Sequence, residues 1–172
     1  MNNIKILLVD DDPVIIKRYQ YVLSKIDGIE HETAENGRIA VDKALNNEPD
    51  IVIMDYLMPV MDGFTASKKI LSIYPQAVII VSTAMDKDEI REKMYDAGAV
   101  LFINKPVDNA FLQMTLEKFA EVAALRKAPK EEKKSRNLTK LESKLIEKSE
   151  SFGMSAGEFD ELYGKTYLDE IT

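Results

Sequence analysis

The chain has 172 residues, 45% of them hydrophobic and 31% charged, with no Cys, no Trp and one His, His31. This composition supports a packed core, and the length suits one domain with an appendage. The absence of Cys excludes a disulfide framework, a zinc ribbon, an iron–sulfur cluster and a cysteine nucleophile. One His argues against a His-rich metal site and a Ser-His triad.

The formal net charge of −7 argues against a broadly basic nucleic-acid binder. The longest uncharged stretch, around residues 75–85, is too short to span a bilayer, and the first residues lack the anatomy of a signal peptide. We therefore expect a cytoplasmic protein that does not interact with the membrane.

Four short apolar runs are typical of buried strands, and each stops at polar residues. They lie at residues 4–9, 51–54, 78–81 and 100–103. Residues 29–33 alternate in polarity, which predicts a fifth strand nearer a sheet edge.

Helical patterns separate these runs. Asp12 followed by Pro13 predicts an N-cap and a first helical position, and Asp86 with Glu89 has the spacing of a capping box. Buried strands that alternate with helices indicate a parallel sheet covered on both faces. We predict a doubly wound α/β domain of five strands and five helices over residues 1–125. The helices are expected at residues 14–26, 36–47, 63–74, 86 to about 98, and 107–125.

The composition changes after this domain. Residues 126–136 hold six basic and two acidic residues, which is typical of a solvated linker. Residues 137–172 show two short amphipathic patterns separated at Gly153. We predict a small helical hairpin there, which serves as an interaction tail.

Residues suited to chemistry follow the predicted strands. Asp10 and Asp11 follow residues 4–9, and Asp55, Thr83 and Lys105 follow later strands. In an open parallel sheet, ligands bind beyond the carboxyl ends of the strands. Three carboxylates there repel each other unless a hard cation lies among them, and Mg²⁺ suits so few protein ligands. With a hydroxyl and an ammonium added, the site suits a phosphoryl group on a carboxylate oxygen.

Each of these residues also has a simpler explanation when it is taken alone. The acids at residues 10–12 are explained as helix caps, Asp55 as a loop acid, Thr83 as the end of a strand, and Lys105 as a surface lysine before a proline. All of them together at successive strand ends favour a functional site.

Residues 1–125 resemble the receiver domain of two-component response regulators, including the single-domain chemotaxis type. The resemblance is carried by LLVDDDP at residues 7–13, MDYLMPVMDG at 54–63, STA at 82–84 and the AG…FINKP stretch at 97–106. These motifs are specific because their order and spacing hold throughout. The resemblance implies a flavodoxin-like receiver fold and a phosphoprotein of phosphorelay signal transduction.

The resemblance assigns Asp55 as the phosphoacceptor, which takes a phosphoryl group from a sensor histidine kinase or a phosphotransfer protein. It implies Mg²⁺ held by Asp11 and Asp55, by Asp10 mainly through water, and by the backbone carbonyl of Leu57. Leu57 and Met85 place apolar side chains beside the site, where some relatives have polar or acidic groups. We therefore expect an aspartyl phosphate that is not short-lived.

The resemblance further implies that Thr83 hydrogen-bonds the phosphoryl group and that Lys105 pairs with it. Phe102 matches a switch aromatic that turns inward on activation, and it biases the face made by the fourth helix, fifth strand and fifth helix. The bond between Lys105 and Pro106 matches a peptide bond that is cis in this family.

Three hypotheses compete for the output. We favour regulated binding of a downstream protein through the receiver face and residues 137–172, with a homodimer on activation as one form. The alternative is a transcriptional regulator with a reduced helix-turn-helix, to which residues 138–142 and 153–159 are faintly similar. Four basic against eight acidic residues in the tail argue against DNA contacts. An enzymatic output is the third, and we expect the chain not to be an enzyme because the tail is too short for an active site.

Overall fold

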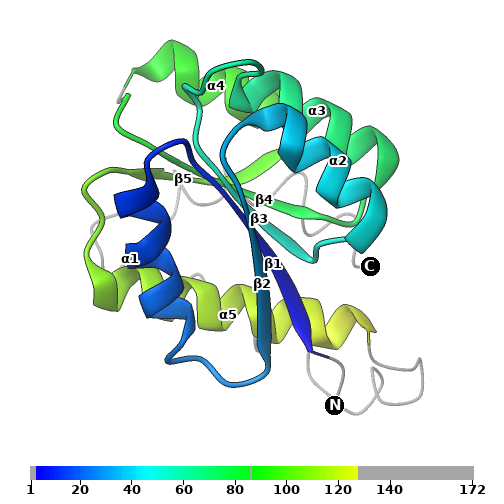
Figure 1. Ribbon diagram of the computed structural model, residues 1–172, viewed down its shortest axis with the longest axis vertical. Helices are drawn as coiled ribbons and strands as arrows, with labels where there is room; N and C mark the ends of the chain where they lie inside the picture. Colours follow the sequence, from blue (N-terminus) through cyan, green and yellow to red (C-terminus); the bar gives the residue numbers. More distant parts are fainter. Residues whose placement is uncertain (1–2, 86, 128–172) are drawn as a thin grey trace. The chain divides into compact units, whose positions relative to one another are not determined.

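Five parallel strands form the centre of the fold, in the order β2-β1-β3-β4-β5 (Figure 1). The structure is a computed structural model that describes residues 3–85 and 87–127. The doubly wound α/β fold predicted from the sequence is confirmed. The strands are β1 (Ile4–Val9), β2 (Ile29–Ala34), β3 (Ile51–Met54), β4 (Val78–Thr83) and β5 (Ala99–Asn104).

Helices cover both faces of this sheet. Figure 1 shows α1 and α5 on one face and α2, α3 and α4 on the other. Each helix returns the chain to the end of the sheet where the strands begin. All five strands therefore finish at the opposite end, the carboxyl end of the sheet. The helices are α1 (Pro13–Leu23), α2 (Gly37–Asn47), α3 (Gly63–Ile73), α4 (Asp88–Asp96) and α5 (Asn109–Lys127).

Burial explains the apolar runs of the central strands. Every residue of β3 and β4 is buried, and in β1 only Lys5 is exposed. Strand β2 lies at the sheet edge beside β1 and leaves Glu30, His31 and Glu32 exposed. A central strand meets helices on both faces and is mostly apolar, whereas β2, at one edge of the sheet, carries exposed polar residues.

Side-chain caps fix where four of the described helices begin; at α5, Ala110 N donates to Asp108 Oδ1 at 2.8 Å. Each cap satisfies a backbone N–H that has no partner within its own helix. The predicted N-cap at Asp12 is confirmed. The bonds run from Val14 N to Asp12 Oδ1 at 2.8 Å, from Ile39 N to Asn36 Oδ1 at 3.0 Å, and from Thr65 N to Asp62 Oδ1 at 2.7 Å.

Helix α4 starts differently from the prediction. It begins at Asp88, and its N-cap is Lys87, whose side chain makes no capping hydrogen bond. The helix thus begins two residues later than predicted, and the capping box predicted from Asp86 is not tested, because residue 86 lies outside the described residues. The acids Asp88 and Glu89 lie in the first turn, where their negative charge interacts favourably with the positive end of the helix dipole.

Residues 128–172, with most of the predicted linker and all of the predicted helical tail, lie outside the described residues. The domain boundaries at 125, 126–136 and 137–172 remain predictions. Within residues 3–85 and 87–127, no helix is both long enough and apolar enough to cross a bilayer.

A glycine is required at the start of α3. A Cβ atom on Gly63 would lie 2.0 Å from the backbone oxygen of Asp55, and a backbone atom cannot move aside as a flexible side chain can. Gly63 N also donates a hydrogen bond to Tyr56 O at 2.9 Å. This close approach fixes α3 directly against the residue that follows β3.

We expect Gly63→Ala to lower the free energy of unfolding by about 3 kcal/mol, at the upper end of what overpacking costs. Gly28→Ala is the matched control, because a Cβ there meets no atom within 4 Å and only the positive φ of 75° opposes it. That strain costs about 1 kcal/mol. Urea unfolding of both variants measures the difference, and equal losses would contradict the close contact.

Candidate functional site

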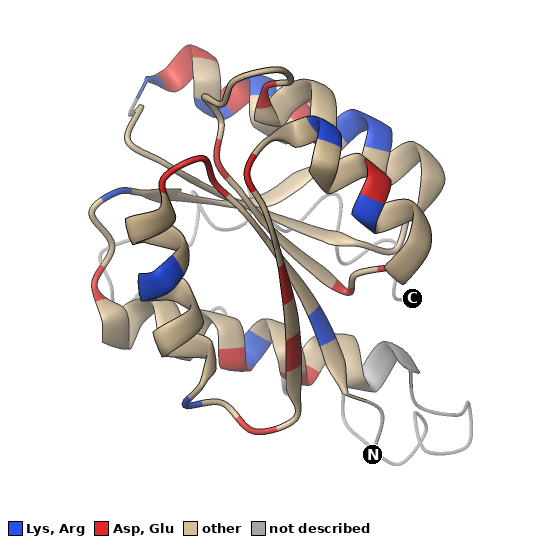
Figure 2. Cartoon of the chain, in the orientation of Figure 1, with Lys and Arg blue, Asp and Glu red and all other residues tan. Residues whose placement is uncertain are grey.

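Three carboxylates meet where β1 and β3 end. Asp10 and Asp11 follow β1, and Asp55 follows β3; Figure 2 shows acidic residues in the loop after β1. One oxygen from each residue lies within 4.8 Å of the others. Asp10 and Asp55 are buried, whereas Asp11 is exposed. The structure therefore brings together the acids that the sequence singled out, and their mutual repulsion favours a bound cation.

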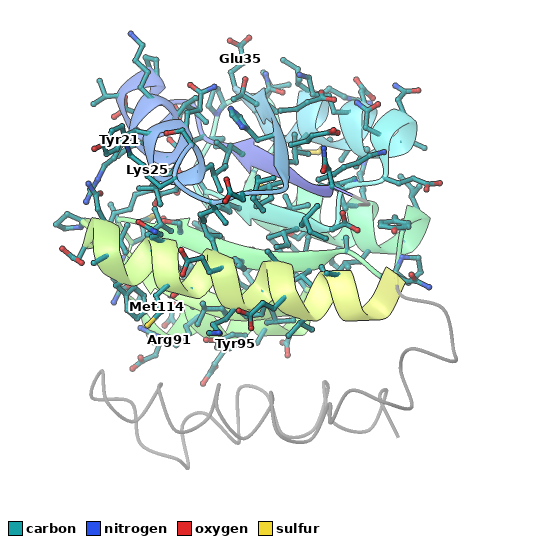
Figure 3. The ribbon with its side chains drawn as sticks, turned by 90° about the horizontal axis from the view of Figure 1, so that it is seen from below. Tyr21, Lys25, Glu35, Arg91, Tyr95 and Met114 are labelled. Carbon is teal, nitrogen blue, oxygen red and sulfur yellow. The ribbon has the colours of Figure 1, made fainter. Side chains whose placement is uncertain are left out.

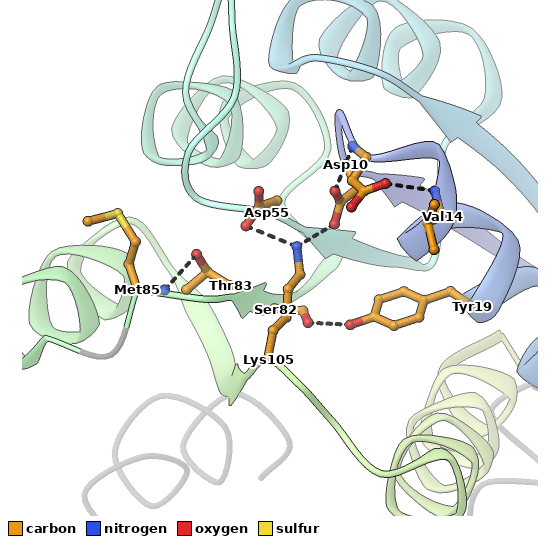
Figure 4. Close-up of polar contacts among 9 residues, drawn as sticks. Asp10, Val14, Tyr19, Asp55, Ser82, Thr83, Met85 and Lys105 are labelled. Atoms are coloured by element: carbon orange, nitrogen blue, oxygen red, sulfur yellow. Dashed lines mark hydrogen bonds and ion pairs between the residues drawn. The ribbon is translucent and has the colours of Figure 1, made fainter.

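Lys105 lies between the two buried carboxylates (Figure 4). Its Nζ donates a hydrogen bond to Asp10 Oδ2 at 2.5 Å and lies 3.3 Å from Asp55 Oδ1. The contact with Asp55 is an ion pair, because Asp55 Oδ1 makes no hydrogen bond within the described part of the chain. The other oxygen of Asp10 accepts a hydrogen bond from Asp12 N at 3.0 Å. Asp10 is thus held at both oxygens.

Burial and charge shift the pKa of two groups in this cluster. Burial raises the pKa of Asp55 above its ordinary value of 3.8; the charge of Lys105 opposes this effect and the charge of Asp10 adds to it. Burial by itself lowers the pKa of Lys105. The hydrogen bond to Asp10 and the charges of Asp55 and Asp10 outweigh burial, so the pKa of Lys105 is raised. Lys105 therefore remains a cation at neutral pH.

Thr83 and the apolar neighbours lie around the same strand ends. Thr83 is the last residue of β4 and is buried, and its Oγ1 accepts a long hydrogen bond from Met85 N at 3.4 Å (Figure 4). Met85 is half-buried, whereas Leu57, in the loop after Asp55, is 62% exposed. The roles expected for the Thr83 hydroxyl and the Leu57 carbonyl stay predictions.

Phe102 is buried in β5, with 2% of its surface exposed. The guanidinium of Arg91 lies 4.7 Å from the centre of its ring. Arg91 and Tyr95, one turn apart, lie on the same side of α4 (Figure 3). The predicted switch aromatic thus has its inward orientation, although its switching role stays a prediction. The peptide bond between Lys105 and Pro106 is cis, as the resemblance implied.

The sequence did not single out two buried hydroxyls beside the site. Tyr19 of α1 is 2% exposed, and its hydroxyl forms a hydrogen bond with the hydroxyl of Ser82 (Figure 4). A tyrosine on the apolar stripe of a helix looks like ordinary packing, and its partner is 63 residues away. No local sequence signal could have found this contact.

A cavity of about 590 Å³ lies away from the acidic cluster, beside the edge strand β2. Its charged walls are paired with one another. Lys43 Nζ lies 3.2 Å from Glu32 Oε2, and Asn47 Nδ2 donates to Glu32 Oε1 at 2.6 Å. Because these polar groups satisfy each other, the cavity is not a second candidate site.

Comparison with known proteins agrees with this geometry. The family model of the response regulator receiver domain matches residues 6–117. The chain belongs to the response regulator receiver family. The resemblance inferred from the sequence motifs is thereby confirmed, together with its place in two-component phosphorelay signalling.

Curated relatives of this receiver are longer proteins. The protein-glutamate methylesterase/protein-glutamine glutaminase 4 of Hahella chejuensis is 39% identical over 104 residues, which cover 59% of this chain and 27% of the relative. The protein-glutamate methylesterase/protein-glutamine glutaminase of Archaeoglobus fulgidus is 40% identical over 114 residues, which cover 64% and 32%. The chain thus spans about a third or less of these relatives.

Solved structures of receivers have the same fold. A CheY-like receiver domain protein from Methanospirillum hungatei aligns with a TM-score of 0.67 and 25% identity, over 71% of this chain and 97% of that one. CheY in a CheX-CheY-BeF3-Mg complex from Borrelia burgdorferi aligns with a TM-score of 0.62 and 31% identity, over 66% and 86%.

These comparisons contradict one prediction made from the sequence. We expected a phosphoacceptor that is not an enzyme, whereas the curated relatives are named as enzymes. The prediction rested on the small size of residues 137–172. It took no account of the enzymes to which receivers of this kind are joined, in which the matched part is 27–32% of the length.

The raised pKa of Asp55 predicts how stability depends on pH. A group whose pKa is raised on folding stabilises the fold fully below its ordinary value, here 3.8, and this contribution is lost as the pH rises through the raised pKa. With EDTA present, we expect Asp55→Asn to unfold at higher urea than wild type near neutral pH. The difference should narrow as the pH falls toward 3.8.

Asp11→Asn serves as the control, because the exposed Asp11 keeps its contact with water and its replacement changes the burial of charge less. Urea unfolding of the two variants and wild type at several pH values makes the comparison. A wild type as stable as Asp55→Asn near neutral pH would show that Lys105 already offsets the burial of the Asp55 carboxylate.

Proposed function

We propose that this chain is a phosphoacceptor switch, in which Asp55 takes a phosphoryl group from a phosphohistidine on a sensor histidine kinase or phosphotransfer protein. One observation carries the proposal. A half-buried ammonium, Lys105, lies 2.5 Å from Asp10 and 3.3 Å from Asp55, at the end of the sheet where the parallel strands finish. Ligands of such sheets bind at this carboxyl end. The proposal includes a cytoplasmic location, where a response regulator meets its kinase.

The chemistry needs little more than positioning and charge. An oxygen of Asp55 attacks the phosphorus, the bond from phosphorus to the imidazole nitrogen breaks, and the imidazole leaves. The phosphoryl group adds about −1.5 to −2 charges to a site that is already acidic. Lys105 pairs with its oxygens, and the hydroxyl of Thr83 donates a hydrogen bond to one of them.

The donor set fits Mg²⁺. Three carboxylates lie within 4.8 Å of one another, and the single ammonium of Lys105 cannot neutralise all of them. Hard cations of this kind bind carboxylate and carbonyl oxygens and keep several waters. Asp11, Asp55 and the Leu57 carbonyl would hold the ion, and Asp10 would contribute mainly through water. The bound ion supplies positive charge to the transferring phosphoryl oxygens.

The switch acts on the face formed by α4, β5 and α5. Phe102 belongs to β5, and Arg91 of α4 lies over its ring, so a movement of Thr83 toward the phosphoryl group changes the packing next to this face. A downstream protein or a second copy of the chain binds the changed face. The names of the relatives favour a further candidate, an enzymatic output under the control of the receiver.

We expect wild type, but not Asp55→Ala, to gain one phosphoryl group from acetyl phosphate with Mg²⁺, as measured by intact mass. Asp11→Ala should gain far less, because it removes a metal ligand and leaves the acceptor in place. Beryllofluoride with Mg²⁺ should change the solution size or the partner binding of wild type only. A wild type that gains no phosphoryl group would refute the proposal.

The output is tested with the same samples. Methanol release from a methylated glutamyl protein, stimulated by beryllofluoride, would support control of an enzymatic output. Retention on DNA would support the reduced helix-turn-helix instead. Capture of a protein partner or dimer formation, absent in Asp55→Ala, would support regulated binding.

The apolar neighbours of the site predict a phosphoryl group that persists. Neither Leu57 nor Met85 can orient an attacking water. We expect Leu57→Asn to shorten the half-life of the phosphorylated protein, by about tenfold at most for one positioned polar group. Ile73→Asn is the matched control, since Ile73 is also an exposed apolar residue, 42% exposed, at the last position of α3. A wild type that loses its phosphoryl group as fast as Leu57→Asn would contradict this account.

A further inference from the structure

Two consecutive residues of α1 reach the ends of the two strands that carry Thr83 and Lys105. Tyr19 is 2% exposed, and its hydroxyl shares a hydrogen bond with the hydroxyl of Ser82, which is 1% exposed (Figure 4). Ser82 is the residue before Thr83 in β4. The bond therefore connects α1 to the backbone that carries the Thr83 hydroxyl.

Arg18 makes the second connection. Its Nη2 donates a hydrogen bond to the backbone oxygen of Val107, and its Nε donates to Asn109 Oδ1 at 2.7 Å. Val107 lies two residues after Lys105, and Asn109 is the first residue of α5. Arg18 therefore holds the segment that leaves the site after Lys105.

The two connected strand ends are also bonded to each other. Lys105 N donates a hydrogen bond to Thr83 O at 2.8 Å. A displacement of either residue therefore moves the other. Arg18 and Tyr19 bracket this pair, one on each side, although neither side chain contacts Asp55 in the structure.

Packing alone does not explain the buried hydroxyl pair. A Phe and an Ala fill nearly the same space, and replacing both partners of a buried hydrogen bond by apolar groups can be nearly neutral for stability. The hydrogen bond between the two hydroxyls orients α1 relative to β4, because it fixes the distance and angle between them. Effective phosphoryl transfer depends on such positioning.

We infer that Tyr19 and Arg18 are positioning residues for phosphoryl transfer, which hold Thr83 and Lys105 at their working places around Asp55. The inference rests on the proposed function, since it concerns the same site. Tyr19 acts through Ser82, and Arg18 acts through Val107 and Asn109. The first helix is thereby part of the site without supplying a group to the reaction.

The test compares Tyr19→Phe, Ser82→Ala and the double variant with wild type. Tyr21→Phe is the matched control, because Tyr21 is on the same helix but 60% exposed, and the centre of its ring lies 4.8 Å from Lys25 Nζ (Figure 3). The initial rate of phosphorylation is measured against acetyl phosphate concentration at saturating Mg²⁺. The half-life of the product and the thermal stability are measured on the same samples.

We expect Tyr19→Phe and Ser82→Ala each to lower the maximal rate by roughly three- to tenfold, with little change in the KM for acetyl phosphate. The double variant should equal either single variant, since all three remove one bond. Tyr21→Phe should behave as wild type. Arg18→Gln should lower the maximal rate as well, and Lys17→Gln, at the neighbouring exposed position, should not.

A lowered melting temperature with an unchanged rate, measured where all variants are folded, would overturn the inference and leave the contacts structural. Additive effects of the two single variants would also overturn it, because they would then not act through one bond. Failure of wild type itself to take up a phosphoryl group would refute the proposed function, and the inference would fall with it. The phosphorylation of wild type tests the proposed function, and the rate of each variant relative to wild type tests the inference.

Discussion

The structure depends on one half-buried cation among carboxylates. Lys105 lies between Asp10 and Asp55, which are 4% and 8% exposed, and no apolar group could take its place without leaving two buried charges opposed. Breaking such a buried pair costs about 3–5 kcal/mol, because the remaining charge has neither water nor a partner. The same contact joins the residue that follows β5 to the residues that follow β1 and β3. With Asp11 added, the site keeps an excess of negative charge that a bound metal ion would offset.

The strands and this cluster could be predicted from the sequence because simple geometry connects them. In a parallel sheet with right-handed crossovers, all strands finish at the carboxyl end of the sheet. Residues that follow apolar runs therefore come together whatever their separation in the chain. Asp10, Asp55, Thr83 and Lys105 are all of this kind. The alternation of β2 likewise indicated an edge strand, and its exposed Glu30, His31 and Glu32 bear this out.

The remaining features depend on contacts that a linear pattern does not contain. The bond between Tyr19 and Ser82 needs the orientation of α1 on the sheet, which is set by packing of the whole layer. Gly63 is read from the sequence only as a helix start, whereas the structure shows that it must approach the backbone of Asp55. Val60, with a φ of 67° and 81% exposure, has a backbone conformation that a β-branched residue rarely adopts. The turn between Asp55 and α3 imposes it against local preference.

The mistaken prediction about enzymatic activity has a different origin. The acidic cluster lies within the described domain, and a fold of this kind is used with many outputs. Regions with about 40% identity to this chain are parts of longer proteins named as methylesterases. The cluster determines how a signal is received. The acids alone do not determine what the receiver controls, so the same cluster is compatible with an enzyme, a dimer or a docking protein.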